Sequence, residues 1–203
     1  MPNTIGFIGV GTMGLPMVKN LLQAKFLVTV FDLNTAAVKD AVKAGATPAA
    51  SAQDVATNTE IIITMLPDTS DVETVLFGEN SISQGLTAGK LLIDMSSVSP
   101  EATVEFAARI NALGCEYLDA PVSGGEVGAI SGKMTIMVGG PEAAFNRAKP
   151  AFDAMGSTVT LIGTRNGDGQ VCKVANQIIG GVMVNAVAEA LLFADKAGAD
   201  ARQ

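Results

Sequence analysis

The chain has no histidine and no tryptophan, and its 203 residues include only one tyrosine and two cysteines. Without an imidazole, acid or base chemistry must come from lysine, aspartate, glutamate or tyrosine. Cys115 and Cys172 form no Cys-x-x-Cys pair, and two cysteines are too few to staple a chain of this length. We therefore expect two buried free thiols and no metal site.

Basic residues are also scarce, since 13 Lys and Arg face 20 Asp and Glu, for a net charge of -7. Nucleic-acid affinity depends on concentrated basic residues, so this balance argues against a nucleic-acid partner. The N-terminus lacks the features of a signal peptide, and no apolar run approaches the roughly 20 residues that a bilayer requires. The sequence predicts a cytoplasmic protein with no membrane partner.

A glycine-rich turn stands at the start of the chain. Apolar residues 5–8 precede Gly-Val-Gly-Thr-Met-Gly at 9–14, a helical pattern follows over 15–23, and residues 27–31 form a second apolar run. This is the G-x-G-x-x-G pattern in its strand, turn, helix and strand context. Such glycines let the backbone approach a pyrophosphate, which the helix N-terminus attracts. The sequence predicts a dinucleotide site.

Asp32 follows the second apolar run and bears on which dinucleotide is bound. Its carboxylate would accept hydrogen bonds from an adenosine ribose and would repel a 2′-phosphate. The following residues 33–36 supply no arginine to receive that phosphate. NAD is favoured, and NADP is the alternative.

The alternation of strands and helices continues along the chain. Apolar runs predict strands over 60–66, 91–95, 116–119, 134–138 and 158–162, and helical spacing predicts helices over 35–44, 52–57, 100–113 (with Ser99 as N-cap), 141–155 and 170–197. We expect an α/β, Rossmann-type doubly wound, mostly parallel sheet, followed by a long helix. Residues 65–68 and 95–97 lie at strand ends, where an open sheet binds its ligands.

Two segments in the second half of the chain carry candidate chemistry. Ser123, Gly124 and Gly125 follow a strand end, and such a turn can bind a carboxylate through a hydroxyl and backbone N–H groups, although a flexible surface loop has the same composition. At 3.6 residues per turn, Lys173 lies beside Asn176 and Gln177. Burial would lower the pKa of this lysine toward the range of a general acid or base, whereas an exposed lysine on an amphipathic helix is the alternative.

The chain resembles the β-hydroxyacid dehydrogenases, the family of 3-hydroxyisobutyrate dehydrogenase and tartronate semialdehyde reductase. The resemblance covers essentially the whole chain and is carried by residues 7–17, 63–67, 93–97, 119–125 and 169–177. The Lys-Val-Ala-Asn-Gln and Asp-Ala-Pro-Val-Ser-Gly-Gly-Glu sequences look most like the tartronate semialdehyde reductases. This implies NAD(P)-dependent reduction of tartronate semialdehyde (2-hydroxy-3-oxopropionate) to glycerate, or an equivalent semialdehyde and hydroxyacid interconversion.

The resemblance also implies roles for individual residues. Lys173 would be catalytic, and the substrate would be held by Ser123, Gly124, Gly125, Asn176 and Gln177, although many relatives have Asn where this chain has Gln177. The expected cofactor-binding residues, from the glycine turn and the strand ends together with the resemblance, are Gly9, Gly11, Thr12, Met13, Gly14, Asp32, Met65, Leu66, Pro67, Asp71, Ser96 and Ser97.

Family members run on for roughly another domain beyond the length of this chain. We expect residues 1–164 to form the dinucleotide-binding domain and residues 165–203 to begin an all-helical domain that is otherwise missing, so that the chain alone binds NAD but is weakly active or inactive. The full-length form is expected to be a homo-oligomer. Apolar residues Ile178, Ile179, Val182, Met183 and Val184 beside Gly180 and Gly181 suggest self-association.

Alternative functions differ in what they require. A 3-hydroxyisobutyrate dehydrogenase, from the same family, is one alternative. A decarboxylating enzyme of the 6-phosphogluconate type would need cationic residues near Ser123 or Lys173 for a substrate phosphate, and none is there. An imine reductase would be expected to lack the lysine. A non-catalytic dinucleotide-binding module would need neither Lys173 nor the serine turn, so their presence favours an enzyme.

Overall fold

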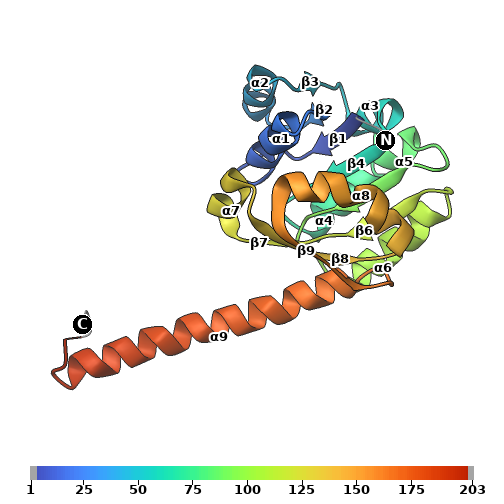
Figure 1. The fold of residues 1–203 in the computed structure, drawn as a ribbon. Coiled ribbons are helices and arrows are strands. Elements are labelled where there is room, and N and C mark those ends of the chain that lie inside the picture. Colours follow the sequence, from blue (N-terminus) through green and yellow to red (C-terminus); the bar gives the residue numbers. More distant parts are fainter. Residues whose placement is uncertain (1–3, 201–203) are drawn as a thin grey trace.

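The fold is known from a computed structural model that describes residues 4–200, and one mixed sheet forms its centre (Figure 1). The strands are β1 (Thr4–Ile8), β2 (Leu27–Phe31), β3 (Thr47–Pro48), β4 (Ile61–Thr64), β5 (Leu91–Asp94), β6 (Glu116–Asp119), β7 (Val122–Ser123), β8 (Met134–Gly139) and β9 (Gly156–Gly163). The order is β3-β2-β1-β4-β5-β6-β8-β7, and β9 pairs with β8.

The pairing separates the sheet into two parts. From β3 to β6 all neighbours are parallel, in the 3-2-1-4-5-6 order of a Rossmann fold. Strand β8 then runs antiparallel to β6 and β7, and β9 is parallel to β8. The predicted doubly wound, mostly parallel sheet is confirmed. The order of the strands reverses at β1 and β4, where such sheets bind ligands.

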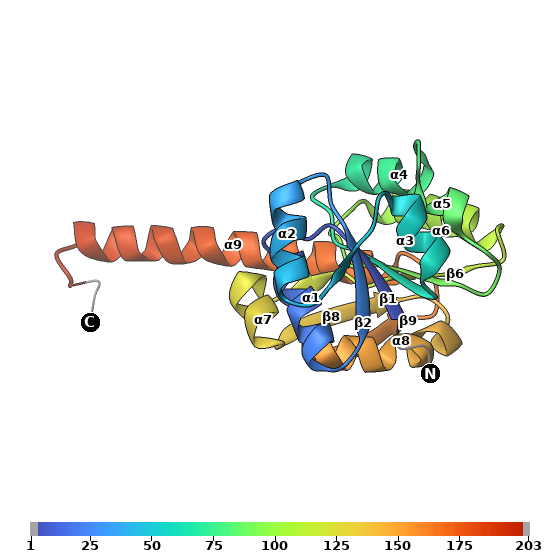
Figure 2. The ribbon, with the colours of Figure 1, turned by 90° about the horizontal axis from the view of Figure 1, so that it is seen from above.

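Helices cover both faces of the sheet (Figure 2). One core forms beneath α1 (Gly14–Gln23), α2 (Thr35–Lys43), α7 (Gly125–Ser131) and α8 (Glu142–Met155). The other forms beneath α3 (Ala52–Asn58), α4 (Thr69–Phe77), α5 (Ile82–Gly85) and α6 (Pro100–Asn111). The central strands β4 and β5 are buried throughout because both of their faces are covered.

Several elements differ from the sequence prediction. The short helices α4, α5 and α7 and the two-residue strands β3 and β7 were not predicted. Asp68 caps α4, since its Oδ1 accepts a hydrogen bond from Asp71 N at 2.9 Å. The predicted cap of α6 is confirmed, because Ser99 Oγ accepts from Ala102 N at 3.3 Å. Cys115 is buried as expected, whereas Cys172 is only half-buried.

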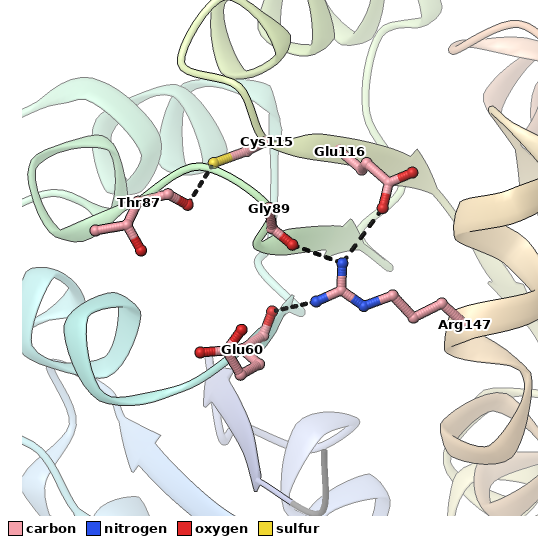
Figure 3. A network of polar contacts seen from close by, with 6 residues as sticks. All are labelled: Glu60, Thr87, Gly89, Cys115, Glu116 and Arg147. Atoms are coloured by element: carbon pink, nitrogen blue, oxygen red, sulfur yellow. Dashed lines mark hydrogen bonds and ion pairs between the residues drawn. The ribbon is translucent and has the colours of Figure 1, made fainter. Parts of the chain in front are cut away.

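Arg147 of α8 joins three segments at the amino ends of the central strands (Figure 3). Its guanidinium donates to Gly89 O at 2.6 Å, to Glu116 Oε2 at 3.3 Å and to Glu60 O at 3.4 Å. Glu60 directly precedes β4, Glu116 begins β6, and Gly89 lies just before β5. The arginine therefore fixes the end of the sheet opposite to the glycine turn.

The last helix, α9 (Asp168–Lys196), extends away from the rest of the protein, as both ribbon views show. Its 29 residues span about 44 Å at 1.5 Å per residue. Only its start packs against the sheet, and its apolar side chains from Ile178 to Phe193 are exposed. By length and composition α9 could cross a membrane, which the sequence analysis did not expect. A helix whose exposed apolar side is covered by other helices has the same composition.

Candidate functional site

The glycine turn after β1 has the close packing that its sequence requires. Gly9 has a φ of +93°, and a Cβ there would lie 2.3 Å from Met65 O. A Cβ at Gly14 would lie 1.9 Å from Gly9 O, so the start of α1 approaches the turn as closely as backbone atoms allow. A Cβ at Gly11, in contrast, would meet nothing within 4 Å and would project into open space.

That open space lies at the N-terminus of α1. The helix has no acidic residue in its own first turn, and Met13 at its start makes no side-chain capping hydrogen bond. The positive end of its dipole is therefore not neutralised by the residues of the helix itself. Thr12 is exposed and Met13 is half-buried beside this end. A helix start of this kind suits the pyrophosphate of a dinucleotide, and the turn therefore fits the predicted cofactor.

Asp32, directly after β2, is tied to the same turn. Its Oδ2 accepts a hydrogen bond from Val10 N at 2.7 Å, and its Oδ1 accepts one from Asn34 N at 2.7 Å. These two bonds fix the carboxylate at the carboxyl end of the sheet, where the ribose of a dinucleotide would lie.

The residues expected after β4 and β5 also meet at this edge of the sheet. Leu66 N donates to Ser96 Oγ at 2.9 Å, which ties the two strand ends together. Ser96 is fully buried, while Ser97 and Pro67 are exposed and Met65 and Leu66 are half-buried. Asp71 is exposed in the first turn of α4.

A buried carboxylate supports this strand end. Asp94 Oδ1 accepts hydrogen bonds from Thr64 Oγ1 at 2.8 Å and Ser96 N at 3.1 Å, and Tyr117 OH donates to Oδ2 at 3.4 Å. Burial raises the pKa of Asp94, although the hydrogen bonds from Ser96, Thr64 and Tyr117 oppose that rise. The network fixes the backbone on which the exposed Ser97 stands.

Lys173 lies in the second turn of α9 and is 92% buried. The alternative of an exposed surface lysine is therefore wrong. Burial lowers the pKa of its ammonium below the ordinary value. Within residues 4–200 no carboxylate pairs with Lys173 and no hydrogen bond holds its Nζ. A desolvated and unpaired lysine can exchange a proton with a bound substrate.

Lys173 opens into a cavity of about 390 Å³ at the carboxyl edge of the sheet. The cavity lies between the segment that follows β5 and one face of α9, and its lining residues are Ser97, Val98, Gln170, Lys173, Val174, Gln177 and Ile178. The structure thus brings together three of the predicted residues, Ser97, Lys173 and Gln177. A larger hollow of about 530 Å³ between α6 and the start of α9 is lined by none of the predicted site residues.

The other predicted substrate residues do not line this cavity. Asn176 is exposed on α9. Ser123 is half-buried at the end of β7, and Gly124 and Gly125 begin α7 with φ values of +131° and +58°. These two backbone conformations favour glycine, which explains the sequence of the turn.

Two residues that the sequence analysis did not single out hold the start of α9. Asp119 Oδ1 accepts from Gly167 N at 2.7 Å and its Oδ2 accepts from Gln170 N at 3.0 Å. The Gln170 side chain donates to Ser96 O at 2.8 Å and accepts from Val98 N at 3.2 Å. Burial raises the pKa of Asp119 to about 6, against the lowering effect of these backbone hydrogen bonds. The sequence did contain a signal for Gln170, because it precedes Lys173 by three residues and therefore lies on the same helix face.

The sequence profile of the NAD-binding domain of 6-phosphogluconate dehydrogenase matches residues 4–163. The profile described as NAD-binding of NADP-dependent 3-hydroxyisobutyrate dehydrogenase matches residues 167–203. These matches show an NAD(P)-binding fold and leave the choice between the two dinucleotides open.

Similar proteins include 2-hydroxy-3-oxopropionate reductase of Escherichia coli, which is 52% identical over 97% of this chain and 66% of its own length. The NAD-dependent L-serine dehydrogenase of Pseudomonas aeruginosa is 39% identical over 98% of this chain and 66% of its own. A structure of Mycobacterium tuberculosis 3-hydroxyisobutyrate dehydrogenase with L-serine superposes with a TM-score of 0.92 at 34% identity, covering 98% of this chain and 67% of that one. The chain spans just under two thirds of the length of the curated relatives.

Proposed function

The chain belongs to the β-hydroxyacid dehydrogenase family of NAD(P)-binding oxidoreductases, and on that premise we propose that it contributes the cofactor site and the acid/base lysine of a tartronate semialdehyde reductase. Such an enzyme reduces 2-hydroxy-3-oxopropionate to glycerate. The observation that carries the proposal is the buried Lys173, which pairs with no carboxylate among residues 4–200 and lies in a cavity whose opposite wall is Ser97. The identity to the E. coli reductase supports the choice of substrate.

In this proposal the dinucleotide lies across the carboxyl edge of the sheet. Its pyrophosphate is held at the start of α1 over Gly11, Thr12 and Met13, and its adenosine ribose is held by Asp32. Residues 65–67, Asp71 and the pair Ser96 and Ser97 complete this site. We propose NAD rather than NADP, because the Asp32 carboxylate would repel a 2′-phosphate.

In this proposal Lys173 is the group that donates or accepts the proton of the reaction. When NADH is bound, it supplies a hydride to the aldehyde carbon of the substrate. Negative charge then grows on the carbonyl oxygen, and a protonated Lys173 donates a proton to that oxygen. In the reverse direction, neutral Lys173 accepts the hydroxyl proton. Because burial lowers the lysine pKa, both protonation states are closer in free energy than those of an exposed lysine.

We propose that the turn at Ser123, Gly124 and Gly125, which lies outside the lining of the cavity at Lys173, holds the substrate carboxylate, with Asn176 and Gln177 as further contacts. The hydroxyl and the backbone N–H groups of such a turn can bind a carboxylate without a cationic side chain. Holding that end of the substrate would place its carbonyl carbon at reactive distance.

We further propose that residues 1–164 form the dinucleotide-binding domain and residues 165–203 begin a second, helical unit. The exposed apolar side chains along α9 support this division, since a stable helix of this composition needs other helices packed against those side chains. We place the protein in the cytoplasm and expect a homo-oligomer.

A second candidate is oxidation of 3-hydroxyisobutyrate or of serine, because the proteins that carry those names match nearly the whole chain at 34–40% identity. Both substrates carry a carboxylate and a hydroxyl on the β carbon, so the lysine chemistry would be the same. The group on the α carbon, a methyl in one and an ammonium in the other, would distinguish them.

The test is a substrate panel with the native full-length polypeptide. We expect NADH-dependent reduction of tartronate semialdehyde to exceed that of methylmalonate and succinate semialdehydes, and a loss of several orders of magnitude in kcat for Lys173→Ala. The rate of the oxidation direction should rise with pH through a pKa below the ordinary lysine value, since neutral lysine is the base. Full activity of Lys173→Ala would overturn the mechanism, and a preference for another semialdehyde would overturn the substrate.

A further inference from the structure

Gln170 joins the two walls of the lysine cavity. Its side chain is fully buried in the first turn of α9. The carboxamide donates to Ser96 O at 2.8 Å and accepts from Val98 N at 3.2 Å, and both partners flank Ser97 in the chain. A carbonyl can only accept and an N–H can only donate, so these two partners fix which end of the carboxamide is oxygen and which is nitrogen.

The backbone around Gln170 is fixed as firmly as its side chain. Its N–H donates to Asp119 Oδ2 at 3.0 Å, so the end of β6 anchors the first turn of α9. A Cβ added at the neighbouring Gly169 would lie 2.5 Å from Met137 O and 2.9 Å from Gly139 N, which shows that the helix start presses directly on β8. The first turn of α9 therefore has little freedom to shift or rotate.

Lys173 stands three residues after Gln170 and on the same face of the helix. The side chains of both residues line the same cavity, opposite Ser97 and Val98. Any movement of the Ser96–Val98 backbone relative to α9 would change the distance between Lys173 and whatever is bound against Ser97. The two carboxamide bonds of Gln170 are direct links between these two walls.

We propose that Gln170 is a positioning residue that sets the distance and orientation of Lys173 relative to the Ser96–Val98 segment. This rests on the proposed function, in which Ser97 contacts the dinucleotide and Lys173 transfers the proton. Gln170 acts through these residues and handles no proton itself. A loss of alignment between hydride and proton transfer is expected to lower kcat, because small displacements of reacting groups are costly in rate.

The first test compares Gln170→Leu with Arg147→Ala in the native full-length polypeptide. Leucine keeps the bulk of the side chain but makes neither hydrogen bond. Arg147→Ala removes three hydrogen bonds at the opposite end of the sheet and serves as the matched control for lost stability. We expect kcat to fall roughly tenfold to hundredfold in Gln170→Leu and to stay at the wild-type value in Arg147→Ala. Equal kcat in the two variants, whether retained or lost, would overturn the proposal.

The second test uses Gln170→Glu, which does not depend on the leucine variant folding. An ionised glutamate can accept from Val98 N but cannot donate to Ser96 O, whereas a protonated glutamate can do both. We therefore expect the ratio of variant to wild-type kcat for reduction to rise as the pH falls. Asp119 and Lys173 also titrate beside position 170, and an ionised glutamate there would raise the pKa of Lys173. That coupling alone would keep Lys173 protonated and favour reduction at high pH, so a ratio that rises as the pH falls reports the lost hydrogen bond instead. A ratio that does not change with pH would overturn the proposal.

Lys173→Ala measured alongside separates this proposal from the proposed function. If Lys173→Ala is inactive and Gln170→Leu is fully active, the lysine chemistry stands and the positioning role is wrong. If Lys173→Ala keeps full activity, the proposed function is wrong, and the positioning role falls with it.

Discussion

The backbone N–H of Val10 donates a hydrogen bond to the carboxylate of Asp32, with 2.7 Å between Val10 N and Asp32 Oδ2. The turn after β1 and the acid after β2 are therefore joined within the protein itself. The carboxylate is oriented before any ribose approaches, so no side-chain freedom has to be lost on binding.

Replacing Asp32 should change the choice of cofactor. In Asp32→Ala we expect the preference for NADH over NADPH to fall at least roughly tenfold, since the charge that repels a 2′-phosphate is gone. Titrations that give Kd for both dinucleotides measure this. Asp32→Asn is the control, because it loses the charge but keeps an oxygen that can accept from Val10 N. An unchanged Kd ratio in both variants would contradict the role given to the carboxylate.

Substitutions at Gly14 and Gly11 should affect different properties, namely the stability of the fold and the affinity for the cofactor. In Gly14→Ala the new Cβ would lie 1.9 Å from Gly9 O, so we expect a loss of about 3 kcal/mol in the free energy of unfolding. In Gly11→Ala the Cβ meets open space, and stability should change by less than about 0.5 kcal/mol, while Kd for NADH rises. Urea unfolding and NADH titration of both variants test this. A Gly11→Ala protein that binds NADH normally would show that the cofactor does not approach that position.

Asp119 should make stability fall as the pH rises. Its pKa is raised to about 6 in the folded protein, so the folded state binds the proton more tightly than the unfolded state. The resulting stabilisation is complete below about pH 4 and is lost by about pH 6, with an upper limit of about 3 kcal/mol. Urea midpoints of wild type and Asp119→Asn between pH 4 and 7 measure it. A constant difference between the two proteins over this range would rule it out.

The exposed face of α9 should cause self-association of the 203-residue polypeptide. Val182→Glu places a charge where the native side chain is 64% exposed in the middle of the apolar helix, and we expect the dissociation constant for self-association to rise at least about tenfold. Val127→Glu on α7, where the native valine is 79% exposed, is the control for added charge. Sedimentation velocity over a range of concentrations measures the change. A wild-type monomer at high concentration would contradict the expectation.

The sequence predicted the parts of this fold whose signals are local. Buried runs such as residues 61–64 and the Ser99 cap are readable because burial pattern and capping depend on near neighbours. The helix α7 was missed because its glycine-rich sequence is typical of a loop, and its start depends on two glycines with positive φ. The turn at Ser123 and the lysine were found as motifs, but motifs do not say which of them share a cavity.

The anchoring of α9 could not be predicted for a different reason. Asp119 and Gln170 are 51 residues apart in sequence, and Gln170 and Ser96 are 74 apart. Such contacts depend on how β5, β6 and β8 are ordered in the sheet, and the antiparallel insertion of β8 beside β6 is not visible in any local pattern.

The way in which α9 is attached also has a mechanical consequence. The helix behaves as a lever whose pivot is its first turn, and its far end lies about 44 Å away. A tilt of about 5° at the pivot would carry that end sideways by roughly 4 Å, so a small rearrangement around Asp119 and Gln170 is amplified along the helix. Any structure fixed to the distal end of α9 would therefore move together with the base of the cavity at Lys173.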